Sequence, residues 1–438
     1  MSVTLLPADL PEGGLLVGWR KEDRAAWPPA GFHYGRQRSR SGGPLQPILY
    51  HGDGHLMSIA PTGAGKGVGS IIPALLRHPG SVVVIDPKGE NHAVTARRRR
   101  EMGQQVVLLD PFGVTGGRTD AFNPLDLLRI GGGSVSAALM LASMLVPEHA
   151  GNIDPYWNGR SRALLSAWML MDSAPGEPTT LATLRRHAQG DTDAMAILAA
   201  KMERSTIPLV RAAAGILGMR ADRTRHGILS TLQSHVADFV GERIEAATSR
   251  TDFDLDGLVR GDPLSIYLVI PPHRLDSSRR LLRAWIGALF GVILRRRRRV
   301  TPPTLFLLDE AAQLGPLDEL RQAITLLRGY GLQTWSFWQD LGQLQELYPQ
   351  DWQTMYNNCH VHQVFGVTTM HLATTVESLN EVHPAEELLV MDRADMQLSM
   401  AGSLPVIARR PDYLSDPCFE GRFESNPFYL PPAGKAGE

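Results

Sequence analysis

The sequence predicts an α/β protein with a central, mostly parallel sheet that is interrupted by an inserted all-α domain. Continuous β-branched runs, which are typical of buried parallel strands, occur at "SVVVID" (81–86) and "QQVVLLD" (104–110). Similar runs return at "PLSIYLVIPP" (263–272) and "PTLFLLDEAAQLG" (303–315), and the long stretch between the two groups carries almost only helical patterns. Strands that alternate with helices favour right-handed crossovers and a parallel sheet that helices cover on both faces.

Length and composition indicate an ordinary globular chain. It has 438 residues, enough for two or three domains, of which 43% are hydrophobic and 20% charged. Its 44 basic and 45 acidic residues leave a net charge near −1. This balance excludes a globally basic nucleic-acid binder, so any DNA contact has to come from local basic patches or backbone amides. Cys359 and Cys418 are too few for a disulfide framework, which indicates a reducing compartment, by default the cytoplasm.

The sequence shows no membrane-spanning segment. Its longest uncharged apolar stretches, at 134–146 and 284–294, fall short of the roughly 20 residues that cross a bilayer, so both are predicted as core helices. The N-terminal "MSVTLLPADLPEGG" lacks a basic region followed by an apolar one and is not a signal peptide. Residues 1–50 are rich in Gly, Pro and Arg and are predicted as an extended lead-in that is partly strand.

From His55 the predicted elements follow in order. "LMSIA" (56–60) is a short strand, and "KGVGSIIPALLRH" (66–78) continues from it as a helix. "ENHAVTARRRREMG" (90–103) is predicted as a surface helix between two strands. Near Asn123 the pattern becomes helical, and Asp154-Pro155 supplies an N-cap and first-turn proline for one of these helices.

The sheet resumes after the helical stretch. A long helix is predicted at 278–299 and a glycine-ended helix at 317–331, with strands at "LQTWSFWQD" (332–340) and "CHVHQVFGV" (359–367). The predicted organisation is therefore a lead-in at 1–50, an α/β domain at 51–124 and 260–425, an all-α domain at 125–259 and a flexible tail at 426–438.

The stretch "APTGAGKG" (60–67) nearly matches the phosphate-binding pattern G-x-x-x-x-G-K-[ST]. Thr62, Gly63, Ala64, Gly65, Lys66 and Gly67 are the predicted nucleotide-binding residues, because small residues let backbone N–H groups curl around phosphates and the lysine reaches the β- and γ-phosphates. Ala60 is a harmless departure, since its position needs only a small residue. Gly67 is the serious one, because it offers no hydroxyl to Mg²⁺. The alternative is a plain glycine-rich turn between a strand and a helix.

A second acidic motif follows a buried strand. "TLFLLDE" ends in Asp309 and Glu310, which resembles a Walker B arrangement in which Asp309 holds Mg²⁺ through water and Glu310 orients or deprotonates the attacking water. Strands often run out into acidic turns, so the motif is weak by itself. Its order after the glycine loop strengthens it, because ligands of such sheets bind at the carboxyl ends of the strands.

Two further polar residues fit the same site. Gln339 ends the next strand, where it can sense the γ-phosphate; the alternative is a solvated strand terminus. Arg328 ends a helix, where it can reach into a neighbouring subunit as an arginine finger or simply complement the helix dipole.

These residues together resemble the ATPase domain of type IV secretion coupling proteins, the TraG-like relatives of conjugative DNA pumps. The resemblance spans roughly 50–416 and rests on "HLMSIAPTGAGKGVG", "VVVIDPKGEN", "VLLDPFG", "FNPLD", "PYWNGRSRALL", "SIYLVIPP", "FLLDEAAQLG" and "RGYGLQTWSFWQDLGQL". Many relatives also carry "GKG" in the loop, so Gly67 suits the family better than it suits the general motif. The usual two N-terminal transmembrane helices are missing, which leaves open a soluble variant, a truncated form or one anchored by a separate protein.

The resemblance implies a RecA-like domain with an all-α insertion and a hexamer that moves DNA through its pore at the cost of ATP and Mg²⁺. It assigns catalytic roles to Lys66, Glu310, Arg328 and Gln339, and the metal to Asp309. The expected partners are single-stranded DNA, a relaxase or other secreted protein, and components of the secretion channel. A homo-hexamer is expected when the protein is active, a monomer is possible in isolation, and the expected location is the cytoplasm at the inner face of the membrane.

Two other functions stay open at this stage. A non-hydrolysing recruitment platform is favoured by the missing hydroxyl at Gly67, whereas the complete set of other motif residues favours a motor. A chromosome-handling translocase, as in FtsK or HerA relatives, is disfavoured by the large helical insertion.

Several conspicuous patterns have a structural alternative. The arginine runs at 97–100 and 295–299 are interpreted as solvated helix ends or as DNA- or lipid-binding patches. "DPKGE" (86–90) is either a plain turn or a support of the nucleotide site or of a subunit interface. "CHVH" (359–362) lacks metal-ligand spacing, and the tryptophans at 335, 338 and 352 are interpreted as core residues rather than base-stacking ones.

Overall fold

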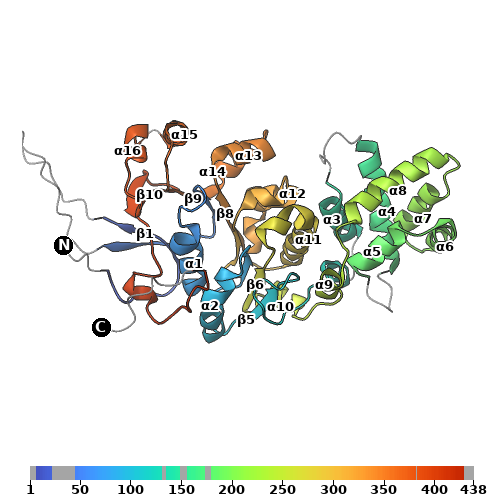
Figure 1. Ribbon diagram of the computed structural model, residues 1–438, viewed down its shortest axis with the longest axis horizontal. Coiled ribbons are helices and arrows are strands. Elements are labelled where there is room, and N and C mark those ends of the chain that lie inside the picture. The colour runs from blue at the N-terminus through green and yellow to red at the C-terminus, as the bar shows by residue number, and fades with distance from the viewer. Residues whose placement is uncertain are drawn as a thin grey trace, which may run out of the picture. The chain divides into compact units, whose positions relative to one another are not determined.

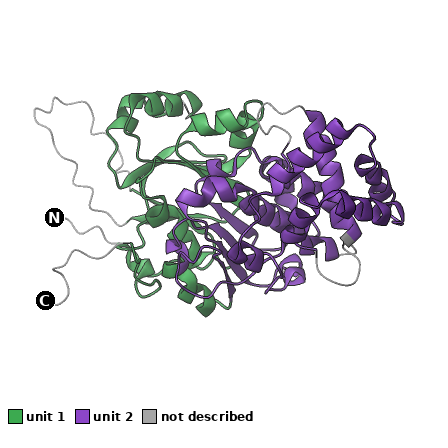
Figure 2. Ribbon diagram, turned by 45° about the vertical axis from the view of Figure 1, so that its right-hand side comes forward, with its two compact units in different colours: residues 1–79, 93–103, 333–438 green, residues 80–92, 104–332 purple. Residues whose placement is uncertain are grey.

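Strands and helices alternate along the chain in a computed structural model that describes residues 6–21, 45–130, 135–147, 155–172, 179–380 and 382–428 (Figure 1). The chain divides into two compact units, which Figure 2 colours separately. Unit 1 comprises residues 1–79, 93–103 and 333–438, and unit 2 comprises residues 80–92 and 104–332. Unit 1 therefore combines segments from both ends of the chain, and unit 2 is interrupted only by residues 93–103.

The sheet of unit 1 combines parallel and antiparallel strands in the order β2-β1-β11-β10-β9-β3-β8. The neighbouring pairs from β2 to β9 are antiparallel, and β3 pairs in parallel with β9 and with β8. The strands are β1 (Leu15–Arg20), β2 (Gln46–Tyr50), β3 (His55–Ile59), β8 (Leu332–Trp338), β9 (Cys359–Val364), β10 (Asp395–Met400) and β11 (Val406–Arg409). The sequence pattern predicted β3, β8 and β9 but not the hairpin of β10 and β11, whose residues alternate less clearly.

Helices of unit 1 flank this sheet, and one of its hydrophobic clusters gathers residues from both ends of the chain. Trp19 of β1, Ile72 of the first helix and Phe419 belong to this cluster, and each is at most 1% exposed. The other helical segments are η1 (Gly67–Ile71), α1 (Ile72–Arg77), α2 (Glu90–Glu101), α13 (Leu341–Leu347), α14 (Trp352–Asn357), α15 (Met370–Asn380), α16 (Ala385–Leu389) and η6 (Pro417–Phe419). Trp335 and Trp338 are also fully buried, so the prediction that they are core residues is confirmed.

Unit 2 contains an all-parallel group of strands in the order β7-β4-β6-β5. These are β4 (Val82–Ile85), β5 (Gln105–Leu109), β6 (Leu264–Leu268) and β7 (Thr304–Leu308), all of which the β-branched runs predicted. Every residue of β4, β6 and β7 is buried, as expected for parallel strands that are covered on both faces. The long helix α11 (Leu275–Ile293) follows β6, and its apolar stretch is buried throughout.

The described residues between β5 and β6 form helices and loops and contain no strand. Within this group α4 packs against α3, α7 and α8, and α3 packs against α11. Several of these helices are drawn in green in Figure 1. They are η2 (Pro124–Arg129), α3 (Val135–Leu145), α4 (Pro155–Asp172), α5 (Leu181–Ala188), α6 (Thr192–Glu203), α7 (Pro208–Leu217), α8 (Asp222–Val236), α9 (Glu242–Ala247) and α10 (Leu255–Arg260). The compact units do not separate this group from β4–β7, so the domain boundaries at 125 and 259 stay predictions, and 429–438 of the predicted tail lie outside the described residues.

The remaining helical segments of unit 2 precede β8 in the sequence. They are η3 (Pro272–Arg274), η4 (Ala311–Leu314), α12 (Asp318–Leu326) and η5 (Leu327–Tyr330). Among the helices that the structure describes, none is both long and apolar enough to cross a membrane. The apolar stretches of α3 and α11 are core segments, as predicted.

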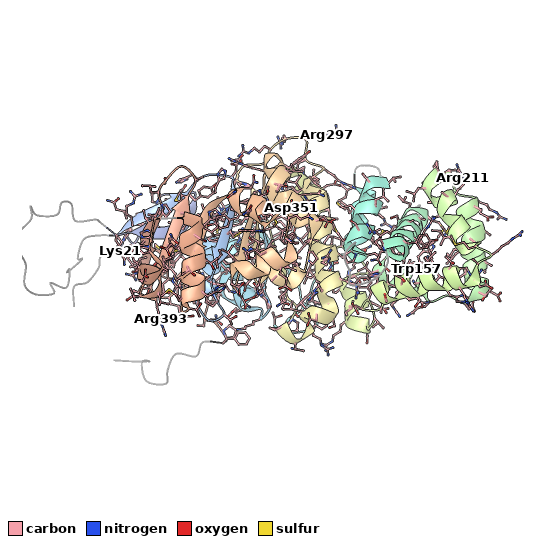
Figure 3. The ribbon with its side chains drawn as sticks, turned by 90° about the horizontal axis from the view of Figure 1, so that it is seen from above. Lys21, Trp157, Arg211, Arg297, Asp351 and Arg393 are labelled. Carbon is pink, nitrogen blue, oxygen red and sulfur yellow. The ribbon has the colours of Figure 1, made fainter. Side chains whose placement is uncertain are left out.

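The two arginine runs each contain one buried member, which neither the solvation nor the DNA-binding interpretation anticipated. Arg99 is 0% exposed, and its guanidinium donates to the carbonyls of Leu75 and His78. Arg296 is 4% exposed and also donates to backbone carbonyls. Arg297 is exposed and projects outward just after α11 (Figure 3). The prediction of a surface helix at 90–103 is therefore only partly right, because α2 buries Arg99 on one of its faces.

Candidate nucleotide-binding site

The glycine-rich loop of unit 1 has the backbone geometry of an anion-binding concavity. Gly63 and Gly65 have φ angles of 79° and 87°, in the left-handed region where a Cβ atom is strained. Lys66 between the loop and the helix has a right-handed backbone and is 8% exposed. Left-handed residues that alternate with right-handed ones turn successive N–H groups toward the same side, where they can bind phosphate oxygens.

The helix after the loop begins with the π-helical turn η1. Its closing hydrogen bond runs from the N–H of Ile72 to the carbonyl of Gly67, and such turns are frequent at functional sites. A Cβ atom built on Gly67 meets no atom within 4 Å. The position that normally carries a serine or threonine hydroxyl therefore has open space but no ligand for a metal.

Unit 1 places Gln339 beside the start of this loop. The parallel register of β3 and β8 pairs Ile59 with Trp338, and the N–H of Ala60 donates to the Trp338 carbonyl at 2.8 Å. Gln339, the next residue, donates its N–H to Oε1 of Gln343 at 3.0 Å. The loop and Gln339 thus leave adjacent strands at the same level. Ala60 itself is 0% exposed.

Asp309 and Glu310 directly follow β7 in unit 2. Glu310 has φ 53° and ψ 51° and is the one non-glycine residue with positive φ in the part of the chain that the structure describes. A left-handed glutamate is uncommon, and strained residues of this kind cluster at functional sites. The Asp309 carboxylate accepts the N–H of Glu310 at 3.1 Å, so the two acidic residues share one tight turn.

Asp86 lies at the same sheet edge as Asp309, because β4 and β7 are parallel neighbours with Val84 opposite Leu307. Its carboxylate is 0% exposed and accepts the N–H groups of Asn91 at 3.2 Å and His92 at 2.8 Å. Burial nevertheless raises the pKa of Asp86 to about 7, and the negative charges of Glu90 and Asp309 act in the same direction. The "DPKGE" segment thus begins with a buried carboxylate at the edge that also carries Asp309, and its role in the nucleotide site stays a prediction.

These carboxylates fit Mg²⁺ that arrives with a nucleotide. Mg²⁺ usually takes one or two carboxylates together with phosphate oxygens and water. A cation at the edge where Asp86 and Asp309 lie would relieve the repulsion that contributes to the raised pKa of Asp86. No cluster of three or more metal-ligating His, Cys, Asp or Glu side chains exists among the described residues. The donor set therefore suits an ion that phosphates and water complete.

Arg328 is exposed in η5 and lies toward the opposite end of β7. Gly331, which closes its loop, accepts the N–H of Thr304 at 2.9 Å at the start of β7, whereas Asp309 follows the end of that strand. Five residues at about 3.3 Å each put the two edges about 16 Å apart. The structure thus brings Asp309, Glu310 and Asp86 together within unit 2 but leaves Arg328 at another edge.

The loop that carries Arg328 is held by buried Arg296. The Arg296 guanidinium donates to the carbonyl of Gly331 at 2.8 Å and that of Tyr330 at 3.3 Å. It also donates to the hydroxyl of Thr304 at 2.7 Å. Burial lowers the pKa of Arg296 to about 10, which leaves it charged at neutral pH. The sequence analysis did not distinguish Arg296 from the other arginines of the run at 295–299, so it missed this contact with the loop.

The "CHVH" segment is structural. His360 contacts the hydroxyl of Tyr50 at 3.3 Å, and the ring of His362 stacks on Tyr356 with the ring centres 4.0 Å apart. Burial lowers the pKa of His362 to about 4, which keeps it neutral. That the segment binds no metal stays an interpretation from its spacing.

Comparisons with known proteins place these features in one family. Residues 27–379 match the family model described as type IV secretory system conjugative DNA transfer. The chain is 26% identical over 391 residues to conjugal transfer protein TraG of Escherichia coli, covering 84% of this chain and 58% of that protein. It is 32% identical over 286 residues to protein VirD4 of Rhizobium radiobacter, covering 63% and 40% respectively. The chain therefore spans about half the length of these curated relatives.

The solved structure of the plasmid coupling protein TrwB has a similar fold. Its unbound form superposes with a TM-score of 0.66 at 18% sequence identity, covering 83% of this chain and 86% of that one. TrwB has also been solved in complex with ADP and Mg²⁺, with a TM-score of 0.64. The fold of this chain is thus the RecA-like P-loop fold of TrwB, as the resemblance implied. The glycine loop, the acidic strand ends and the match over most of the sequence establish that the chain belongs to the type IV secretory system conjugative DNA transfer family.

Proposed function

We propose that this chain is an ATP-hydrolysing coupling protein that uses ATP and Mg²⁺ to recruit DNA and translocate it into a type IV secretion or conjugation channel. The observation that carries the proposal is the phosphate loop, in which Gly63 and Gly65 adopt left-handed backbones just before Lys66 and beside Gln339. The complex of TrwB with ADP and Mg²⁺ supports this choice of nucleotide and metal.

The residues take the following roles in the proposed reaction. The N–H groups of 62–67 and the ammonium of Lys66 hold the phosphates, except for the N–H of Ala64, which donates to the carbonyl of Pro61 at 3.2 Å. Asp309 would hold Mg²⁺ through water, and the ion would supply charge neutralisation at the phosphates. Glu310 orients or deprotonates the attacking water from its left-handed position directly after Asp309. Gln339 responds to the γ-phosphate at the end of β8.

Arg328 acts in a neighbouring subunit in this proposal. Its exposed loop lies about 16 Å along β7 from the edge that carries Asp309. This distance disfavours a role of Arg328 in hydrolysis next to Asp309 of its own chain. An arginine from a neighbour would stabilise the charge of the transition state and link hydrolysis to the arrangement of a ring. The active form is accordingly a homo-hexamer, and an isolated monomer has little activity.

The proposed cargo is single-stranded DNA, bound to a relaxase or accompanied by another secreted protein. The protein would hand this cargo to components of the secretion channel, at the cytoplasmic face of the inner membrane. Family membership supports these partners.

A recruitment platform that binds nucleotide without hydrolysing it is the second candidate. The observation that favours it is Gly67, where the open space next to the loop carries no hydroxyl for the metal. In that case the nucleotide would stabilise a docking conformation only.

ATP turnover by the full chain, with and without single-stranded DNA, tests the proposal while the oligomeric state is measured in parallel. We expect turnover that rises with DNA and with assembly. Lys66→Ala should abolish nucleotide binding, and Glu310→Gln should bind nucleotide but lose roughly 10²- to 10⁴-fold in kcat. Glu346→Gln, an exposed glutamate on α13, is the matched control and should behave as wild type. Wild-type turnover no faster than that of Lys66→Ala in any oligomer would exclude the motor, and nucleotide binding without turnover would support the platform.

A further inference from the structure

Arg410 contacts the phosphate loop from a strand that lies far away in the sequence. It directly follows β11, and its guanidinium Nη1 donates to the backbone carbonyl of Ala64 at the centre of the loop. A Cβ atom on Gly65 would lie only 3.3 Å from the same nitrogen, so the guanidinium also lies against the next residue of the loop. Its Nε is buried and makes no hydrogen bond, so the side chain is held without all its donors engaged.

An aromatic ring fixes the direction of this arginine. The guanidinium carbon lies 4.7 Å from the ring centre of Phe365, within the range of a cation–π contact. Phe365 is 0% exposed, and its N–H donates to the carbonyl of Ile59 at 3.2 Å, so the ring is tied to the end of β3. The ring under Arg410 therefore follows β9 and is joined by a backbone hydrogen bond to the end of β3, from which the loop starts.

Ala64 is also confined by Gly366. Gly366 has φ 69°, and a Cβ atom there would lie 2.6 Å from the methyl group of Ala64. The backbone after β9 thus approaches the loop as closely as glycine permits, while Arg410 binds the Ala64 carbonyl. These contacts restrict the peptide of Ala64 more than its exposed neighbours Thr62 and Gly63.

We propose that Arg410 is a positioning residue of the phosphate loop, which holds the Ala64 carbonyl outside the concavity so that the loop's N–H groups stay directed at the polyphosphate of a nucleoside triphosphate. N–H groups that point to one side of a loop form an anion-binding concavity, and a contact on the carbonyl side can keep that arrangement when no anion is bound. A charged donor on the opposite, carbonyl side supplies that restraint and polarises the peptide toward a stronger N–H dipole.

The inference rests on the proposed nucleotide binding and adds a residue to it. Neighbouring Arg409 provides a matched control, because its guanidinium lies 3.7 Å from the buried carboxylate of Asp416 instead of contacting the loop. Removing either arginine subtracts the same charge at adjacent positions of the chain, and only one of the two removes the contact with Ala64.

The test measures the affinity of the full chain for a fluorescent, non-hydrolysable ATP analogue with Mg²⁺. Arg410→Ala should raise Kd about tenfold or more, which is the loss expected for a hydrogen bond from a charged group. Arg410→Lys should recover part of the affinity, since it keeps the charge and one donor but not the planar stack. Arg409→Ala should stay within about twofold of wild type.

Thermal unfolding separates positioning from folding. Without nucleotide, Arg410→Lys should unfold close to the wild-type temperature, and its stabilisation by the analogue should be smaller. If Arg410→Ala does not fold, Phe365→Leu removes the stacking ring while the arginine remains, and it should also weaken binding. Arg410 or Phe365 variants that fold and bind as tightly as Arg409→Ala would overturn the inference. Wild type that binds no better than Lys66→Ala would instead overturn nucleotide binding itself.

Discussion

Gly67→Ser restores the hydroxyl that the phosphate loop lacks, and the structure indicates that the loop accepts it. A Cβ atom at this position meets no atom within 4 Å, and Gly67 is not among the glycines with positive φ. The substitution therefore brings neither a clash nor backbone strain. It lies at the start of a helical segment, where serine is about 0.5 kcal/mol more favourable than glycine.

The expected effect on the metal follows from the contact that the hydroxyl would make. The contact of a polar group with a charged one contributes about 1.5 to 3 kcal/mol. Gly67→Ser should therefore lower the Mg²⁺ concentration needed for nucleotide binding roughly 10- to 100-fold. Gly67→Ala supplies the same steric change and an even better helix residue without an oxygen, so it should leave the Mg²⁺ requirement unchanged.

The assay is a titration of Mg²⁺ at fixed fluorescent nucleotide, followed for wild type and for both variants. Unfolding temperatures without nucleotide should rise slightly in both variants. This measurement separates the effect of helix propensity from the effect of the hydroxyl on Mg²⁺. If serine and alanine shift the Mg²⁺ midpoint equally, or if serine shifts it not at all, the metal is not bound next to Gly67 and the reasoning is refuted.

Two further predictions concern buried ionisable side chains, Arg296 and His235. Arg296→Met should lower the free energy of unfolding by about 3 kcal/mol, because it removes the donors of the Leu258 carbonyl and one of the two donors of the Gly331 carbonyl. It should also reduce turnover more than nucleotide binding by loosening the loop of Arg328. The exposed Arg297→Met serves as its control in denaturant unfolding and ATPase assays, and equal effects of the two would contradict the prediction. Burial, aided by the charge of Arg280, lowers the pKa of His235 from 6.5 to about 4. The unfolded chain therefore binds a proton that the folded chain does not, so stability should fall as pH drops from about 6.5 toward 4. His235→Gln should weaken this dependence in thermal unfolding between pH 7 and pH 5, and identical pH profiles would disprove the assignment.

The strands of unit 2 could be predicted because each consists of a continuous apolar run, which only a doubly covered parallel strand accommodates. The hairpin of β10 and β11 could not, because its pattern mixes polar and apolar residues. Asp395, at the start of β10, pairs with Lys21 just after β1, and Gln397 is 1% exposed. Their burial depends on neighbours that only the assembled sheet supplies.

The arginine runs show the same limit within the candidate site. Arg296 and Arg297 are adjacent and chemically identical, yet one is 4% exposed and the other lies on the surface. Both residues follow the end of α11 at Ile293 in an irregular segment, and what each side chain meets depends on the elements packed nearby. A run of one residue type carries no information on that choice.

The sequence by itself determined the phosphate loop, because a left-handed backbone at Gly63 and Gly65 is a local requirement that the residue type reveals. It also determined the order of the acidic strand end and Gln339, since strand and loop signals are local as well. Only the tertiary structure decided that Arg410 reaches Ala64, across 346 residues of chain. That contact exists because β11 and β3 belong to one sheet, with β10 and β9 between them, so that only the long side chain of Arg410 bridges the gap. Pairing between distant strands depends on the packing of the whole unit rather than on any short stretch of sequence.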